Sequence, residues 1–148
     1  MSKGATVAYE TTLRVRDNCL CLHMQRAARA LARRFDEALR PLDLTNGQFS
    51  LLMSLNREDP PTIGSVSALL AMDRTTLTAN LKPLERRGLV KVTIDDADKR
   101  TRRVTLTPPG RVLLVAAVPV WKRTHAAIEQ LLLRSDREQL RADLRALS

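Results

Sequence analysis

Threonines and cations recur at helical spacing between Asp73 and Gly88, and this stretch is well suited to polar recognition. At about 100° per residue, Thr75, Thr78 and Lys82 fall on one side of a helix, opposite a stripe of leucines. Hydroxyls and cations with no acid among them suit the edges of nucleic-acid bases and the phosphates of the backbone. The stretch therefore predicts a helix face that binds nucleic acid.

The neighbouring residues predict the elements that hold this face in place. A short apolar segment follows Thr62, a possible N-cap, and Asp73 can cap the first turn of the next helix. Gly88 is the expected residue just past the end of that helix. The leucine stripe recurs at i, i+4 and i+7 and consists of Leu77, Leu81 and Leu84. Two helices joined by a tight turn are therefore expected.

After Gly88 the apolar period changes from helical to two, which predicts a β-hairpin. Val90, Val92 and Ile94 alternate with polar residues, and a second run follows with Val104 and Leu106. Between them lies a polar loop, residues 95–102, that holds three cations: Lys99, Arg100 and Arg102. Helix, turn, helix and basic hairpin in this order predict a winged helix-turn-helix.

These residues resemble the MarR family of transcriptional regulators, and the resemblance extends from about Asn18 to Leu133. It rests on the Asp-Arg-Thr-Thr-Leu-Thr run that starts at Asp73, on the Leu-Glu-Arg-Arg-Gly-Leu-Val run that starts at Leu84, and on the hairpin. The resemblance implies a mainly α-helical fold with a small β wing, in which dimerisation helices flank the winged helix-turn-helix core at both ends of the chain. It also implies a homodimeric repressor that binds a pseudo-palindromic operator in double-stranded DNA and is released by a small aromatic or phenolic ligand.

The tip of the hairpin matches the family pattern D-x-R-D-x-R with one departure. Asp95, Asp98 and Arg100 fit the pattern, whereas Ala97 stands where the family usually has the first arginine. The resemblance implies that Arg100 lies along or in the minor groove, where narrow A·T tracts concentrate negative potential. We expect Asp98 to orient Arg100 and not to touch DNA.

The predicted recognition helix would place its leading end in the major groove. Arg74 could pair with guanine, and the threonine methyl groups could meet thymine. Lys82, Arg86 and Arg87 are expected to neutralise phosphates without reading sequence. The residues predicted to bind DNA are Arg74, Thr75, Thr76, Thr78, Lys82, Arg86, Lys99, Arg100 and Arg102.

The 148 residues predict one domain, with dimerisation helices in 12–44 and 108–148 around a DNA-binding core at 45–107. Residues 1–10 have little periodicity and predict a frayed arm. A single long helix is expected from Thr12 to Arg40. Two capping boxes are expected, and they consist of Thr45 with Gln48 and of Ser135 with Glu138.

The family resemblance implies a ligand crevice between the dimerisation helices and the winged core. By their chemistry, the candidates to line it are His23, Arg26, Met53, Trp121 and His125. An alternative remains for each of them. Met53 and Trp121 at helical spacing suit an ordinary core, and the two histidines suit the surface or a satisfied interface.

The two cysteines, Cys19 and Cys21, are two residues apart in a predicted helix, where their side chains would point in nearly opposite directions. We therefore expect no disulfide between them. Residues 17–21 resemble the hydroperoxide-sensing branch of the family, and Cys21 falls where that branch keeps its reactive cysteine. Thiol-based redox sensing by Cys21 is thus an alternative function, and a buried structural thiol is the other interpretation.

The composition limits the remaining function classes. The net charge of +9, from 25 basic and 16 acidic residues, indicates an anionic partner such as nucleic acid. No nucleophile with a base, metal cluster or glycine-rich phosphate loop is visible, so neither an enzyme nor a bound metal or cofactor is expected. No apolar run approaches the length of a membrane span and no secretory signal opens the chain, so we expect a cytoplasmic protein that does not bind membranes.

Overall fold

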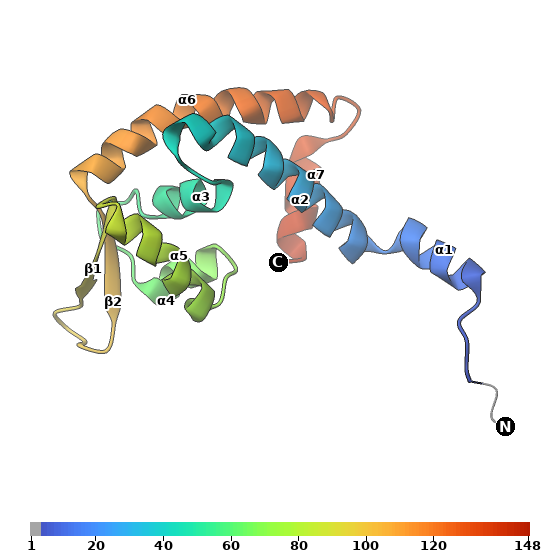
Figure 1. Cartoon of the computed structure of the whole chain (residues 1–148), viewed down its shortest axis with the longest axis horizontal. Helices are drawn as coiled ribbons and strands as arrows, with labels where there is room; N and C mark the ends of the chain where they lie inside the picture. Colours follow the sequence, from blue (N-terminus) through green and yellow to red (C-terminus); the bar gives the residue numbers. More distant parts are fainter. Residues whose placement is uncertain (1–3) are drawn as a thin grey trace.

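Helices predominate in the structure, a computed structural model that describes residues 4–148 and contains one small antiparallel sheet (Figure 1). In chain order the elements are α1 (Tyr9–Asn18), α2 (Leu20–Leu39), the 3-10 turn η1 (Arg40–Leu42), α3 (Asn46–Ser54), α4 (Ile63–Leu69), α5 (Arg74–Arg86), β1 (Val90–Ile94), β2 (Arg102–Leu106), α6 (Pro108–Gln130) and α7 (Arg137–Ala146). The mainly helical fold with a small β wing is therefore confirmed.

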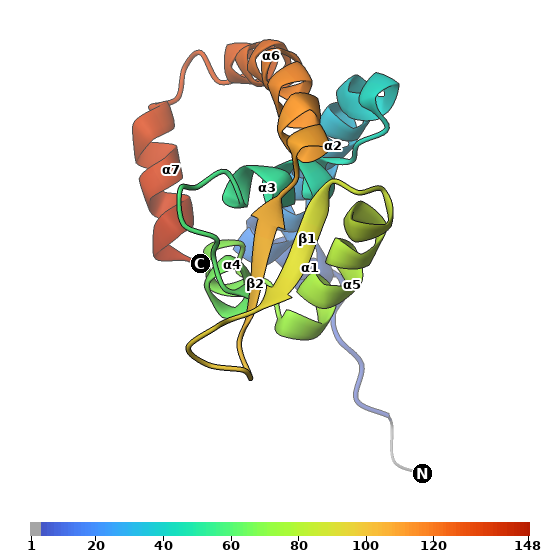
Figure 2. The same ribbon diagram turned by 90° about the vertical axis from the view of Figure 1, so that its left-hand side faces the viewer.

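The long helices α2 and α6 pack against each other and form an arch above α3 (Figure 1). The elements α4, α5, β1 and β2 lie below one end of this arch, and α7 turns back after the end of α6. Helix α1 extends away from the opposite end and buries none of its residues. Viewed from the winged end, the hairpin lies in front of α4, with α5 beside it (Figure 2).

The core lies where the arch meets the winged elements. Leu39 of α2, Leu52 of α3, and Leu77 and Leu84 of α5 are fully buried in one apolar cluster, which Val104 of β2 joins. The predicted leucine stripe therefore faces inward, since Leu81 is also buried. Because burial of a leucine contributes roughly 1.5–3 kcal/mol, the stripe fixes which side of α5 remains exposed.

The hairpin has the predicted alternation. Val90 pairs with Leu106 and Val92 with Val104, so one face of the two strands is apolar. An isolated bridge between Thr62 and Arg103 adds the residues before α4 to the edge of β2. The hairpin is therefore attached directly to the start of the helix-turn-helix.

The predicted single helix over residues 12–40 is wrong, because the chain breaks at Cys19. Cys19 has φ −71° and ψ 110°, an extended conformation, and it separates α1 from α2. Asn18 precedes the break, and its side-chain amide donates to the Arg14 carbonyl over 2.9 Å. Asparagine competes with the helix for backbone partners and so favours a helix end. Of the predicted frayed arm, residues 1–3 lie outside the described residues, and Tyr9 and Glu10 already belong to α1.

The capping predictions have mixed outcomes. The box of Thr45 with Gln48 is confirmed in both directions at the start of α3. The box of Ser135 with Glu138 is wrong, because the side chain of Asp136 caps α7 by accepting from the Gln139 N–H over 3.0 Å. Glu138 instead pairs with Arg141, one turn further along α7. An aspartate at this position accepts from a first-turn N–H with a full negative charge, which the positive end of the helix favours.

Candidate DNA-binding surface

The exposed side of α5 is a polar surface held in place by its buried side. Leu77, Leu81 and Leu84 are buried, and the opposite residues line a shallow hollow in the protein surface. These residues are Arg74, Thr75, Thr78, Ala79 and Lys82. All five are solvent-exposed, and none of them is acidic. The structure thus brings together four of the nine residues predicted to bind DNA, namely Arg74, Thr75, Thr78 and Lys82.

Asp73 fixes the first turn of α5. Its carboxylate accepts from the Thr76 N–H and from the Thr76 hydroxyl, each over 2.8 Å. These two hydrogen bonds lower the pKa of Asp73. The Thr76 hydroxyl is therefore engaged by the cap, which distinguishes Thr76 from its neighbours Thr75 and Thr78.

The turn between α4 and α5 brings their first turns together. Ala71 has φ 49°, in the left-handed region, and the Ser67 hydroxyl donates to the Met72 carbonyl. Across the turn, the guanidinium of Arg74 lies over Gly64 in the first turn of α4. The side chain of Arg74 therefore starts from the junction of the two helices and not from the middle of α5.

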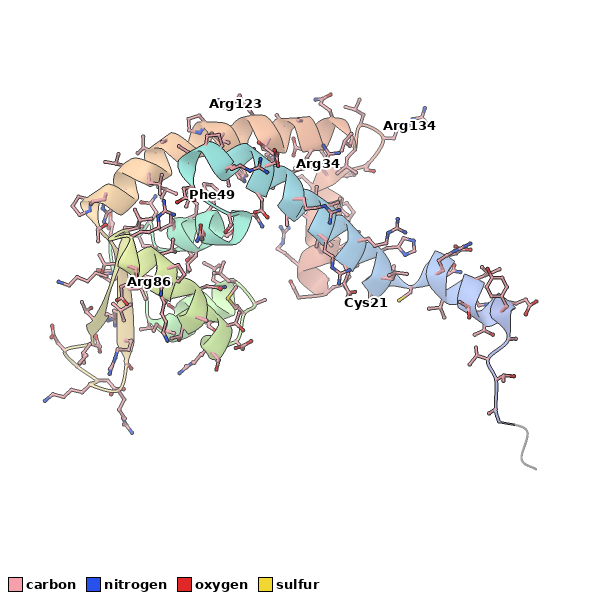
Figure 3. The ribbon with its side chains drawn as sticks, in the orientation of Figure 1. Cys21, Arg34, Phe49, Arg86, Arg123 and Arg134 are labelled. Carbon is pink, nitrogen blue, oxygen red and sulfur yellow. The ribbon has the colours of Figure 1, made fainter. Side chains whose placement is uncertain are left out.

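At the end of α5, a glycine terminates the helix and an arginine contacts a distant part of the chain. Gly88 has φ 71°, as expected for the residue after a helix, and its carbonyl accepts from the Thr107 hydroxyl over 2.5 Å. The guanidinium of Arg87, which the sequence predicts to neutralise phosphate, donates to the Asp43 carbonyl over 2.6 Å. Arg87 therefore ties α5 to the turn after α2. Arg86 remains exposed on the outer side of α5 (Figure 3).

Aspartates organise the wing loop, residues 95–101. Asp98 accepts from the Arg100 N–H over 3.0 Å, and its Oδ1 lies 3.6 Å from Arg100 Nε. The Arg100 side chain is nevertheless 95% exposed, so it extends into solvent from an ordered base. Lys99 and Arg102 are also exposed, and the Arg102 guanidinium donates to the Lys99 carbonyl over 3.0 Å. The three predicted wing cations therefore lie together at the tip of the hairpin.

Sequence reasoning did not identify Arg103 as the residue that anchors the wing. Its guanidinium donates to Asp95 over 2.6 Å and to the Pro60 carbonyl over 2.6 Å. The hydrogen bond from Arg103 is the largest cause of the lowered pKa of Asp95. The sequence did contain a signal for the Asp95 contact. Arg103 pairs with Thr93, so Asp95 is its diagonal neighbour across the hairpin, and opposite charges at such positions lie on one face of the sheet. The contact with Pro60 could not be predicted in this way, because Pro60 lies in an irregular loop between α3 and α4.

The predicted ligand residues divide into two groups. Trp121 stacks between Phe49, at a ring-centroid distance of 6.5 Å, and His125, at 4.8 Å. Met53 and Trp121 line a mainly apolar cavity of about 440 Å³ between α3, the end of α4 and α6. Phe49 reaches toward the arch from α3 (Figure 3). His23 and Arg26 lie elsewhere, in a separate hollow along α2.

Both cysteines are free thiols, as expected. Cys19 is half-buried at the break between α1 and α2, whereas Cys21 is exposed in the first turn of α2 (Figure 3). The Gln25 amide lies 3.4 Å from the Cys21 sulfur.

Across residues 4–148, no cluster of histidine, cysteine and carboxylate side chains could hold a metal ion, and no helix is both long and apolar enough to span a bilayer.

A helix-turn-helix joined to a basic hairpin defines the winged-helix class of DNA-binding folds. The MarR family model matches residues 44–101. The DNA complex of the M. tuberculosis transcriptional regulator MosR has 39% sequence identity and a TM-score of 0.79, over 88% of this chain and 93% of that one. The chain therefore belongs to the MarR family, whose members are transcriptional regulators, and it is a DNA-binding transcriptional regulator.

Further similarities agree with this assignment. The transcriptional repressor CouR, solved bound to a 23-mer DNA duplex, has 26% identity over 97% of this chain and 99% of its own, with a TM-score of 0.79. The organic hydroperoxide resistance transcriptional regulator of Bacillus subtilis has 28% identity over 70% of this chain and 71% of its own length. Curated regulators from Staphylococcus haemolyticus and Escherichia coli O111:H- are matched over 63% and 58% of their own lengths.

Proposed function

We propose that this chain is a homodimeric repressor that binds a pseudo-palindromic operator in the cytoplasm. The observation that supports the proposal most is the cation- and threonine-lined hollow on α5, whose opposite side is buried. A helix anchored in this way can insert its exposed side into a major groove. The similarity to CouR, a transcriptional repressor solved on a DNA duplex, supports repression over activation.

The proposed contacts follow from where each side chain lies. Arg74, Thr75 and Thr78 would meet base edges, whereas Thr76 would contribute through the cap that it forms with Asp73. Lys82 and Arg86 would bind phosphates without reading sequence. The wing tip would place Arg100 in the adjacent minor groove, with Lys99 and Arg102 beside it.

The proposed dimer is supported by the surface of the single chain. A compact monomer of 16.6 kDa exposes about 7,600 Å². This chain exposes 11002 Å², and its helices α1 and α7 bury none of their residues. Large apolar side chains that are at least one-third exposed toward the two ends of the chain are Val7, Tyr9, Val15, Leu20, Leu31, Val112, Val115, Leu131, Leu133, Leu140, Leu144 and Leu147. Residues 12–44 and 108–148 would therefore form the dimerisation segments around a DNA-binding core at 45–107.

A footprint on the DNA upstream of the protein's own gene tests this proposal. We expect two protected segments whose centres lie about one helical turn, roughly 34 Å, apart. Titration of a fluorescent duplex should end at two protein chains per duplex. Binding of one chain per duplex, or equal affinity for every duplex at low ionic strength, would contradict the proposed dimeric repressor.

We further propose that a small aromatic or phenolic ligand occupies the cavity beside Met53 and Trp121 and releases the DNA. The cavity volume of about 440 Å³ and its apolar lining suit one small ring system. Ser50 and Ser54 supply the polar part of this lining, and His125 stacks on Trp121 without lining the cavity itself. His23 and Arg26 line a different hollow, so in this proposal they are not part of the ligand site.

The only tryptophan of the chain makes this idea easy to test, because Trp121 fluorescence reports on the cavity directly. Salicylate and hydroxycinnamate, as representative aromatic carboxylates, should quench the emission and weaken operator binding over the same concentration range. If the ligand quenched Trp121 without releasing DNA, or released DNA without quenching Trp121, the cavity would not be the site that regulates DNA binding.

A second candidate function is hydroperoxide sensing by Cys21. It is favoured by the exposed thiol, by the Gln25 amide 3.4 Å from its sulfur, and by similarity to the hydroperoxide resistance regulator of Bacillus subtilis. An organic hydroperoxide would oxidise the thiol to a sulfenic acid and be reduced to the alcohol. Mass spectrometry of the Cys19→Ser and Cys21→Ser variants after mild treatment with cumene hydroperoxide would locate the added oxygen. An unmodified Cys21 with unchanged operator affinity would exclude this function.

A further inference from the structure

Gly64 and Arg74 approach each other more closely than any side chain at position 64 would allow. An ideal Cβ on Gly64 would lie 2.8 Å from Arg74 Nη2, 3.5 Å from Cζ and 3.9 Å from Nε. The guanidinium therefore occupies the space that a methyl group would fill. Gly64 is the second residue of α4, and Arg74 is the first residue of α5.

Nothing else within residues 4–148 holds the guanidinium in this position. Arg74 donates no hydrogen bond and makes no ion pair there, although Arg87, Arg100 and Arg103 all have such partners. The guanidinium lies over the first turn of α4, and the positive end of a helix does not attract a cation. The position is therefore permitted by the missing side chain and not by an attractive contact.

We propose that Gly64 is a positioning residue for Arg74 and thereby sets which base Arg74 reads. This inference rests on the proposed role of Arg74 in base recognition. The space above Gly64 lets the guanidinium lie at the junction of α4 and α5, beside Thr75 and Thr78 in the same hollow. A bidentate contact with guanine needs both the direction and the distance of the guanidinium, so displacing it changes base preference.

The geometry also distinguishes positioning of Arg74 by Gly64 from a requirement for glycine in folding. The atoms that an added methyl group would meet are the far end of a flexible side chain, so Arg74 can move while the backbone stays. Alanine is moreover a better helix former than glycine. We therefore expect Gly64→Ala to keep or raise the melting temperature while it alters DNA recognition.

Gly47 provides a matched control. It is the second residue of α3, the position that Gly64 has in α4, and its ideal Cβ would meet only Thr45 Oγ1 at 4.0 Å. Gly47→Ala therefore makes the same chemical change in the same helical position, without displacing an arginine. Any general effect of alanine in a first helical turn should appear equally in both variants.

The experiment compares wild type, Gly64→Ala, Gly47→Ala, Arg74→Ala and the double variant Gly64→Ala/Arg74→Ala. The probe is a duplex selected by the wild-type protein from a random library, together with its single-base variants. We expect Arg74→Ala to lose about tenfold or more in affinity and to relax preference at one base pair. Gly64→Ala should lose about threefold or more and alter preference at that same base pair, and Gly47→Ala should stay within about twofold of wild type.

The double variant decides the inference. If Gly64 acts through Arg74, adding Gly64→Ala to Arg74→Ala changes nothing further. Additive losses, an unchanged Gly64→Ala variant, or a Gly64→Ala variant that melts well below Gly47→Ala would each overturn the inference while leaving the proposed role of Arg74 intact. Undiminished binding by Arg74→Ala is a different result, because it removes that role and the positioning of Arg74 with it.

Discussion

The winged-helix elements and the terminal helices bury their apolar side chains in different ways. In α5 and the hairpin, the leucine and valine faces are covered by the same chain, with Leu77, Leu84 and Val104 at most 1% exposed. Helices α1 and α7 bury none of their residues, although α7 carries Leu140 and Leu144 one turn apart and α1 carries Leu13 and Val15. The apolar faces of the winged elements are thus covered within one chain, whereas those of the terminal helices remain exposed.

This difference separates the residues proposed to bind DNA from those proposed to form the dimer. The winged elements need only their caps, their core and the contacts of Arg87 and Arg103 to hold the α5 surface. The terminal helices gain stability when their apolar faces are covered, and a second copy supplies an identical face. Substitutions in the two regions should therefore affect different measurements.

The largest effect is expected in the core of the winged elements. Leu84→Ala removes a side chain with no exposed surface and should lower the free energy of unfolding by about 2–5 kcal/mol. Urea denaturation followed by circular dichroism measures this loss. Leu144→Ala, on an exposed face of α7, is the control and should cost far less at concentrations where the protein is a monomer. Equal losses would contradict the distinction between the two regions.

The sequence allowed the winged elements to be predicted well, because their determinants are local. The stripe of Leu77, Leu81 and Leu84, the caps at Thr62 and Asp73, and the glycine after α5 each depend on residues within a few positions. Periodicity and capping preferences describe this kind of information.

The missed features depend on contacts between distant segments or on competition between neighbouring residues. Arg87 meets Asp43, Arg103 meets Pro60, and Arg74 lies over Gly64, and none of these pairs is visible as a period. The break at Cys19 was missed because the apolar pattern continues through it on both sides. The cap of α7 was misassigned because Ser135 and Asp136 are adjacent and both are good caps, so sequence alone does not select between them.

The next effect concerns the α5 surface alone. Arg74→Ala should cost about 1–3 kcal/mol of operator binding and relax the preference for one base pair, with unchanged stability. Lys82→Ala should weaken binding to all duplexes alike and reduce the salt dependence by about one counterion. Fluorescence anisotropy at several salt concentrations, with operator and random duplexes, separates the two outcomes. If both variants lost affinity equally for both duplexes, the division into base-reading and phosphate-binding residues would be wrong.

A change in the terminal helices should alter self-association before it alters folding. Leu144→Asp places a charge on the exposed apolar face of α7, and we expect self-association to weaken by about tenfold or more, because a charge buried in an apolar interface is costly. Operator binding should fall through the loss of dimers, while binding of one chain to a half-site persists. Analytical ultracentrifugation measures the first effect. The control is Asp143→Asn, on the same helix, and an unchanged dimer in Leu144→Asp would place the interface elsewhere.

The smallest effect expected is a dependence of the wing on pH. The hydrogen bond from Arg103 lowers the pKa of Asp95 in the folded protein, so the ionised carboxylate stabilises the fold. Because the folded pKa lies below the unfolded one, this contribution is fully present above the unfolded pKa of about 4 and is lost as the pH falls through the folded pKa. In thermal melts, wild type should therefore be more stable than Asp95→Asn at pH 6, and the difference should shrink as the pH falls toward 3. The lowered pKa values of Asp73 and Glu138 give the same slope in both proteins, so the difference between the two curves isolates Asp95. A constant difference between the curves would mean that the Arg103 anchor works through its Pro60 contact and not through the charge of Asp95.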